Sequence, residues 1–240
     1  MGTTFAEIIT QWAMQTIDDV TWTQSLAENP AAFFRAKSDT LIASLGHFSR
    51  PPEIKGWLTF TPPSYANYTH TITAQDVGGI PMTITTEYTG MELCHGTLIT
   101  VNNAGQSTFT PIQLSYDAET GTVVLEAVEG YTEFPVGSTV DIDFYTDGVF
   151  DRDLDVEQKH ILGLCVALQW YTRFANTWLN IQPKIKDRSF DTVSESAHIT
   201  AAATKAKEMR LALNDALLRY EENVYYRQRM PMMQKLNPPD

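Results

Sequence analysis

At residues 155–178 the chain reads DVEQKHILGLCVALQWYTRFANTW. Apolar side chains recur in this stretch every three or four positions, which predicts an α-helix that runs to about Leu179. The faces beside the main apolar stripe carry Leu162, Val166 and Trp170, so the helix is expected to be central and largely buried. The acids of the preceding DRDLD suit a helix N-terminus, where the helix dipole favours negative charge.

Toward the C-terminus, a second long helix is predicted from about Ser194 to Arg229. At 1.5 Å per residue its length approaches roughly 50 Å. Pro231, and the two prolines near the end, predict that residues 230–240 form an extended tail. The apolar stripe of the helix consists of Ile199, Ala206, Met209, Leu213, Ala216, Tyr220 and Val224.

Toward the N-terminus, residues 4–48 read as two helices. Phe5, Ile8, Ile9 and Trp12 follow helical spacing in the first. The second is expected to begin at Pro30, because proline is favoured in the first turn of a helix, and Gly46 is a candidate C-cap.

Residues 50–147 change character. Short runs of alternating or β-branched residues, separated by turn residues, predict about seven strands. The clearest hairpin is SYDAETGTVVLE, in which Gly121 supplies the positive φ of the turn. Strands at this spacing are typical of a small antiparallel sandwich or barrel.

The fold class that follows is α+β, a helical bundle with an inserted antiparallel β-sandwich or barrel module. The helices of residues 1–49 and of residues 151–229 are expected to form one bundle. Residues 50–150 are the inserted β-module, and residues 230–240 are the tail.

Charge is distributed unevenly. Residues 50–156 contain fifteen acids and three bases and so carry a net charge of −12, equal to that of the whole chain, whereas residues 157–240 are mildly basic. An acidic module repels phosphate, so non-specific nucleic-acid binding is not expected there. Ordinary solubility is the alternative explanation of the charge.

No membrane span is expected, because the longest apolar run, residues 161–168, is far shorter than the roughly 20 residues required. The N-terminus lacks the pattern of a signal peptide. Two cysteines give no disulfide framework, and synthesis in a reducing cytoplasm is expected.

Glutamate precedes histidine by three residues in three places, Glu92–His95, Glu157–His160 and Glu195–His198. Helical di-metal sites use this spacing. The first pair, however, falls in a predicted strand and the other two at helix starts, so no metal is expected. Motifs for nucleotide binding or nucleophilic catalysis are not found in the sequence, and no cofactor or catalytic residue is predicted.

Four stretches near the two ends of the chain form a familiar pattern. They are FAEIITQWAMQTIDD and NPAAFFRAKSDTLIASLGHF near the N-terminus, and VDIDFYTDGVFDRDLDVEQKHILGLCVALQWYTRFANTWLNIQPKIKDRSFDTVSESAH and LRYEENVYYR near the C-terminus. With these stretches the chain resembles the head-to-tail connector, or neck adaptor, proteins of tailed bacteriophages. The intervening β-module has no segment-by-segment match.

The resemblance implies a non-enzymatic virion protein that forms a ring of about twelve copies between the portal and the tail or a second neck protein. DNA passes through such a ring without specific binding. The expected partner contacts are Tyr225, Tyr226, Met230, Met232 and Met233, and the expected acidic channel face consists of Glu126, Glu129, Glu133, Asp141 and Asp143.

Two other functions stay open from the sequence. One is a carbohydrate- or receptor-binding module on a phage tail, which would use the β-module. The other is a metal-dependent enzyme with a helical site.

Overall fold

A computed structural model describes residues 2–17, 19–76, 80–101, 107–128, 130, 132–181 and 192–236. Inside these ranges it describes the backbone alone at residues 31, 55, 93–95, 101, 107–111, 127–128, 177–181, 192–199 and 228–236. Helices and antiparallel sheets are both present, so the fold class is α+β, as expected.

The chain divides into two compact units. The bundle unit comprises residues 1–19, 36–61 and 148–240, and the β-unit comprises residues 20–35 and 62–147. The two ends of the chain therefore do share one unit. Residues 20–35, expected in the bundle, belong instead to the unit that contains the β-strands.

The N-terminal helical stretch begins at α1 (Phe5–Glu7) and continues through the π-helical η1 (Ile8–Ala13) into α2 (Met14–Thr16). The Thr4 side chain caps it by accepting a hydrogen bond from the Glu7 amide. A further helix, α3 (Val20–Glu28), follows where a connecting turn was expected. The next helix, α4 (Pro30–Ser44), begins at the expected proline.

Between α4 and the strands lie two short 3-10 helices, η2 (Leu45–His47) and η3 (Pro52–Gly56). The bundle unit also holds a small antiparallel sheet that joins β1 (Phe60–Thr61) to β8 (Val149–Phe150). Thr4 forms a bridge to Val149, so the start of the chain is tied to the segment that leads into the next helix.

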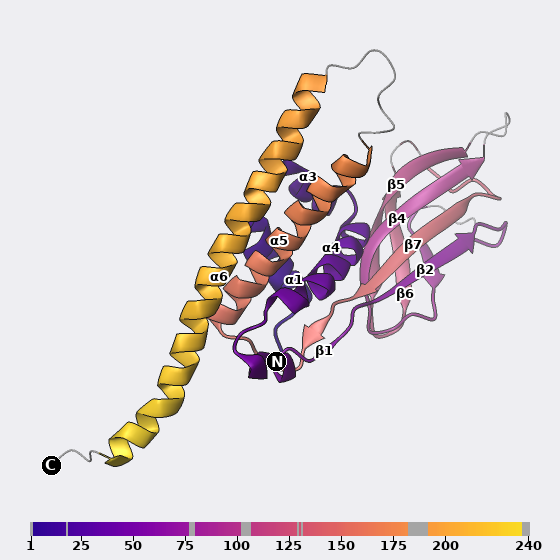
Figure 1. The fold of residues 1–240 in the computed structure, drawn as a ribbon. Helices are drawn as coiled ribbons and strands as arrows, with labels where there is room; N and C mark the ends of the chain where they lie inside the picture. Colours follow the sequence, from indigo (N-terminus) through magenta and orange to yellow (C-terminus); the bar gives the residue numbers. More distant parts are fainter. Residues whose placement is uncertain are drawn as a thin grey trace. The chain divides into compact units, whose positions relative to one another are not determined.

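The central helix is α5 (Val156–Ile181), and the last is α6 (Thr192–Leu236). The middle of α5 is buried on all sides, from Ile161 to Leu168, as its apolar faces predicted. It packs on η1 and along α6, and Figure 1 shows α5 and α6 side by side. A buried hydrogen bond joins them, in which Gln158 Nε2 donates to Tyr220 Oη at 2.7 Å.

Helix α6 corrects one expectation, since it does not end near Arg229 but continues through Pro231 to Leu236. A proline inside a helix removes one backbone hydrogen bond and crowds the preceding turn. The residues around it are mostly good helix formers, Met, Gln, Lys and Leu, and these favour continuation. Residues 230–236 are therefore helical rather than extended, and residues 237–240 lie outside the described residues.

The β-unit contains one antiparallel sheet of six strands in the order β2-β7-β4-β5-β6-β3. Together with β1 they make seven described strands between residues 50 and 147, in agreement with the number predicted there. The strands are β2 (Ser64–Thr71), β3 (Met82–Thr85), β4 (Glu92–Val101), β5 (Ser107–Asp117), β6 (Thr122–Val128) and β7 (Thr139–Thr146). The predicted hairpin joins β5 to β6, with Asp117 opposite Thr122 and Gly121 at φ +70°.

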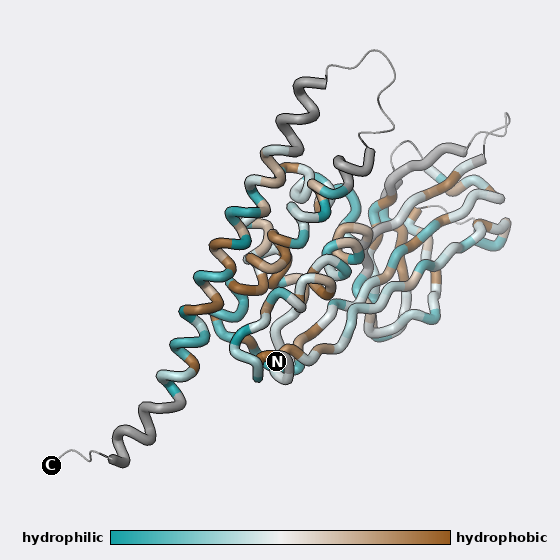
Figure 2. The backbone as a smooth tube through the Cα atoms, viewed as in Figure 1, coloured by the Kyte–Doolittle hydropathy of each residue, from teal (hydrophilic) through white to brown (hydrophobic). Residues whose placement is uncertain are grey.

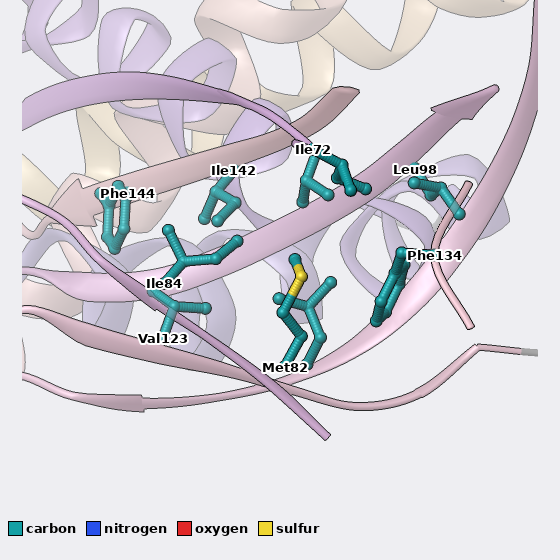
Figure 3. Close-up of a cluster of buried hydrophobic side chains, with 10 residues drawn as sticks. Ile72, Met82, Ile84, Leu98, Val123, Phe134, Ile142 and Phe144 are labelled. Atoms are coloured by element: carbon teal, nitrogen blue, oxygen red, sulfur yellow. The ribbon is translucent and has the colours of Figure 1, made fainter. Parts of the chain in front are cut away.

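The sheet surrounds a single core without closing, because the edge strands β2 and β3 do not pair with each other. Ile84 from β3, Val123 from β6 and Ile142 from β7 all belong to one buried cluster (Figure 3). Strands that are far apart in the sheet order, such as β3 and β7, therefore pack their apolar faces together. The module is an open, curved sheet rather than a closed barrel.

Candidate functional site

The partner contacts expected near the C-terminus lie on α6. The Tyr225 and Tyr226 side chains are exposed. Met230, Met232 and Met233 are in the helical part of the chain by their backbone, and their side chains lie outside the described residues. The two tyrosines are therefore available to a partner, and they lie on α6, within the part of the chain that was predicted to be helical.

Sequence reasoning missed a row of exposed apolar residues on the same helix. Leu211, Leu218 and Tyr225 have exposed fractions of 63%, 48% and 43%. They are spaced by seven residues, which places them above one another along an α-helix. We call these three residues the α6 ridge.

The α6 ridge points away from α5. The face of α6 that packs against α5 includes Leu213, Leu217 and Tyr220, which are all buried. At 100° per residue, the ridge residues lie roughly 120° to 160° around the helix from Leu213. Hydrophilic and hydrophobic residues alternate along the described part of α6 in Figure 2.

A groove lies beside the ridge, between α5 and α6, with a volume of about 380 Å³. Its floor is apolar, because Ile161 and Leu164 are buried there. We call it the α5–α6 groove. Its remaining lining residues are Glu157 and His160 on α5 and Ala212, Asp215, Ala216, Arg219 and Tyr220 on α6.

The acidic residues of β7 lie together on the outward face of the sheet. Asp141 and Asp143 alternate with the buried Val140, Ile142 and Phe144, so their carboxylates point away from the core. This strand lies between β2 and β4 in the sheet order, so both acids are on a central strand.

Neutral donors hydrogen-bond these carboxylates. Thr69 Oγ1 donates to Asp141 Oδ1 at 2.5 Å, and Asn67 Nδ2 donates to Asp143 Oδ1 at 2.9 Å. Neither aspartate forms an ion pair with Lys or Arg within the part of the chain that the structure describes. Their negative charges are therefore left uncompensated on this face.

The other expected channel residues are placed differently. Glu126 is exposed on β6, and β4 and β5 separate that strand from β7. Its neighbour Leu125 is in the shared core, so the Glu126 side chain leaves the sheet on the other side of that core from Asp141. Glu133 is exposed in the connection between β6 and β7, and Glu129 lies outside the described residues. The expected single acidic face is thus limited to the β7 pair.

A pocket of about 180 Å³ adjoins Asp143 within the β-unit. Arg35 from α4, together with Tyr65 and Asn67 from β2, lines it. The Arg35 guanidinium lies 5.5 Å from the centroid of the Tyr65 ring, a cation–π distance. The pocket thus combines one aromatic face with charged and amide groups.

The most perturbed amine of the bundle unit is Lys37, of which only 8% is exposed. Burial lowers the pKa of Lys37 to about 8, with a smaller opposing effect of Asp19 and a further lowering by Arg173. Its Nζ lies 4.0 Å from the ring centroid of Trp170. At neutral pH the Lys37 amine is still mostly protonated, and its positive charge in this buried position costs free energy.

Burial raises the pKa of the Cys165 thiol to about 12. The thiolate is therefore negligible at neutral pH, and Cys165 is a packing residue rather than a nucleophile.

The Glu-x-x-His pairs are placed as the sequence indicated. Glu92 and His95 lie on β4, and the other two pairs lie on helices. Glu157 accepts a hydrogen bond from Asn223 at 3.0 Å and lies 3.8 Å from Arg227, so it connects α5 to α6. Across the described ranges, no three His, Cys, Asp or Glu side chains are grouped to hold a metal ion.

Comparisons with known protein families, with curated proteins and with solved structures found no match to this chain. Within the described ranges, no helix is both long and apolar enough to cross a bilayer.

Proposed function

We propose that the chain is a non-enzymatic structural protein of a phage virion that forms a ring in the neck, between portal and tail. The resemblance of both chain ends to neck adaptors supports the location, and the geometry of α6 supports the ring. Copies of the chain line a channel through which DNA passes.

The observation that carries the proposal is that α6 has two apolar faces, of which only one is covered within the chain. The helix has 45 residues, and at 1.5 Å per residue it is about 67 Å long. Only one face of it packs on α5, while the α6 ridge exposes two leucines and a tyrosine on another face. Long helices with a second apolar face are suited to lie side by side with copies of themselves.

The acidic pair on β7 supports the channel. Asp141 and Asp143 accept hydrogen bonds from the neutral Thr69 and Asn67, and no ion pair with Lys or Arg in the described part of the chain offsets their negative charge. A surface of this kind repels the phosphates of DNA and lets the duplex slide.

The mass of the purified chain, measured by light scattering after size exclusion, tests the proposal. A ring of about twelve copies has about twelve times the chain mass of 27.0 kDa. A single mass of 27.0 kDa at every concentration would refute it.

The pocket beside Asp143 favours a second candidate function, carbohydrate binding by the β-unit. An aromatic ring with amide and charged groups beside it is suited to a sugar, which offers both apolar faces and hydroxyls. A glycan array tests this candidate. Binding that is lost in Tyr65→Ala would support it, and an array without binding would exclude it for the glycans tested.

A further inference from the structure

We propose that the pocket beside Asp143 binds one acidic sugar at the end of a glycan, with the sugar carboxylate held by the Arg35 guanidinium. This inference rests on the second candidate function, carbohydrate binding by the β-unit, and names the class of sugar. It does not depend on the ring. The residues that line the pocket all belong to the β-unit, and they are Ala32, Arg35, Tyr65, Ala66, Asn67, Asp143 and Phe144.

The first step of the argument is the charge of Arg35. It is the only lysine or arginine in the β-unit, whose sequence contains one acid in residues 20–35 and eleven acids in residues 62–147. Arg35 nevertheless forms no ion pair among the described residues, although Asp143 lines the same pocket. A guanidinium that no acid of its own unit neutralises can bind a carboxylate from outside through two parallel hydrogen bonds.

The second step is the position of the guanidinium. Its central carbon lies 5.5 Å from the centroid of the Tyr65 ring, so the aromatic ring supports it inside the pocket. Stacking of this kind uses the plane of the guanidinium, whereas its N–H groups donate along the edge, so the hydrogen bonds to a carboxylate stay possible. The Tyr65 ring also offers an apolar surface against which the C–H groups of a sugar can pack.

The third step is the match to sugar hydroxyls and to size. Asn67 donates to Asp143 Oδ1 at 2.9 Å, and because a carboxylate can accept about four hydrogen bonds, Asp143 can also accept from a hydroxyl. The pocket volume of about 180 Å³ lies below the roughly 300–1,000 Å³ of sites for drug-sized ligands. A volume of this size suits a single sugar ring.

The charge of the whole β-unit limits the charge of the ligand. One guanidinium neutralises one carboxylate, whereas the acids around it repel any further negative charge. DNA and polymers of acidic or sulfated sugars are therefore disfavoured. A glycan that carries one acidic sugar at its end meets both conditions.

Saturation-transfer NMR on the intact chain tests the inference, because it detects weak binding of single sugars. The probes are the methyl glycosides of glucuronic acid, sialic acid, glucose and galactose. At least one acidic probe should bind roughly tenfold or more tightly than either neutral probe, as expected for charge-assisted hydrogen bonds. Neutral probes that bind as tightly as the acidic ones would overturn the inference, and so would a failure of both acidic probes to bind.

Substitution of Arg35 tests its role directly. Arg35→Gln should remove the preference for the acidic probe, and Arg35→Lys should keep only part of it, because lysine retains the charge without the planar fork. The matched control is Arg210→Gln, which makes the same change in charge at an exposed position on α6 and should leave binding unchanged. A preference that survives Arg35→Gln would contradict the assignment.

A steric variant tests the pocket without altering its charges. Ala32→Leu places a larger side chain in the pocket at an exposed helical position, and leucine is a good helix former, so the melting temperature should not change. Binding of every probe should be lost. Ala203→Leu, at an exposed position on α6, is the control and should bind normally. Unchanged binding by Ala32→Leu would place the sugar outside this pocket and overturn the inference.

The outcomes separate this inference from the candidate function on which it rests. Binding of neutral probes alone would overturn the acidic sugar and leave carbohydrate binding standing. If none of the four probes binds, the inference falls, and the glycan array decides whether the β-unit binds any other carbohydrate.

Discussion

Among the charged groups of the bundle unit, the buried amine of Lys37 has the clearest effect on the free energy of unfolding. Its pKa of about 8 lies below the usual 10.5. Between these two values the unfolded chain binds more protons than the folded chain, so this residue makes the protein more stable as pH rises from 8 to 10.5. Below pH 8 the full cost of the buried charge is present.

We therefore expect Lys37→Met to stabilise the protein at pH 7 by an amount up to about 3 kcal/mol, the free energy that corresponds to the pKa shift. The advantage over the wild type should shrink as pH rises toward 10.5. Urea unfolding of both proteins at several pH values between 7 and 10 measures this difference. An advantage that does not vary with pH would show that the amine is not the cause.

Gly163 on α5 is a second residue with a definite role, because a Cβ built there would lie 2.9 Å from Trp12 Cβ and 3.0 Å from the Trp12 carbonyl carbon. Gly163→Ala should destabilise the protein by about 1–3 kcal/mol through overpacking, although alanine is the better helix former. Gly46→Ala is the control, since no atom lies within 4 Å of a Cβ there. Equal stabilities for the two variants in urea unfolding would contradict the close approach of η1 and α5.

At the scale of elements, local patterns predicted most of what the structure contains. Alternation located the strands, and helical periodicity gave the buried stripe of α6, whose members from Ala206 to Val224 are all buried or half-buried. Helix α3 was missed because it is only nine residues long and contains a single buried side chain, Trp22, so no extended apolar stripe marks it in the sequence.

The features that were missed depend on distant parts of the chain. Whether the sheet closes is decided by the pairing of β2 and β3, which no local pattern reports. The heptad spacing of Leu211, Leu218 and Tyr225 is visible in the sequence, but their exposure depends on which face of α6 meets α5. Asp141 and Asp143 lie on one face of β7, whereas Glu126 leaves β6 on the other side of the core, and this separation depends on the curvature of the whole sheet.

The C-terminal end of α6 should be dispensable for folding. Among the side chains of α6 that the structure describes, Tyr220 is the last buried one, and Val224 is half-buried. A chain that ends at Arg229 keeps both of these residues, so it should melt within about 2 °C of the intact chain. In the virion we expect the truncated chain to attach poorly to the adjacent ring. A large fall in melting temperature would assign residues 230–236 to the core of the bundle unit instead.

Strand β7 should govern the interaction with DNA. Asp141→Lys/Asp143→Lys should create binding to duplex DNA at about 50 mM salt that is lost as salt rises, whereas the wild type should not bind. Filter binding over a salt series measures it. The control, Glu28→Lys/Glu53→Lys, makes the same change in net charge at exposed positions elsewhere. If both variants bind DNA equally, net charge and not the β7 face is responsible.

For the whole molecule, we propose that the two compact units have different roles, assembly for the bundle unit and the DNA channel for the β-unit. The bundle unit carries the long helix with its exposed α6 ridge, and the β-unit carries the acidic pair of the proposed channel. The chain has a net charge of −12, and its acids outnumber its bases mainly between residues 50 and 156. An assembly of many such chains concentrates negative charge wherever the β-units gather, as a DNA channel requires.

Electron microscopy of the purified, negatively stained chain tests the central claim most directly. The account predicts closed rings of uniform diameter with an open centre, built from about twelve copies of the 27.0 kDa chain. Fields of separate particles of single-chain size, or assemblies with no central opening, would contradict it.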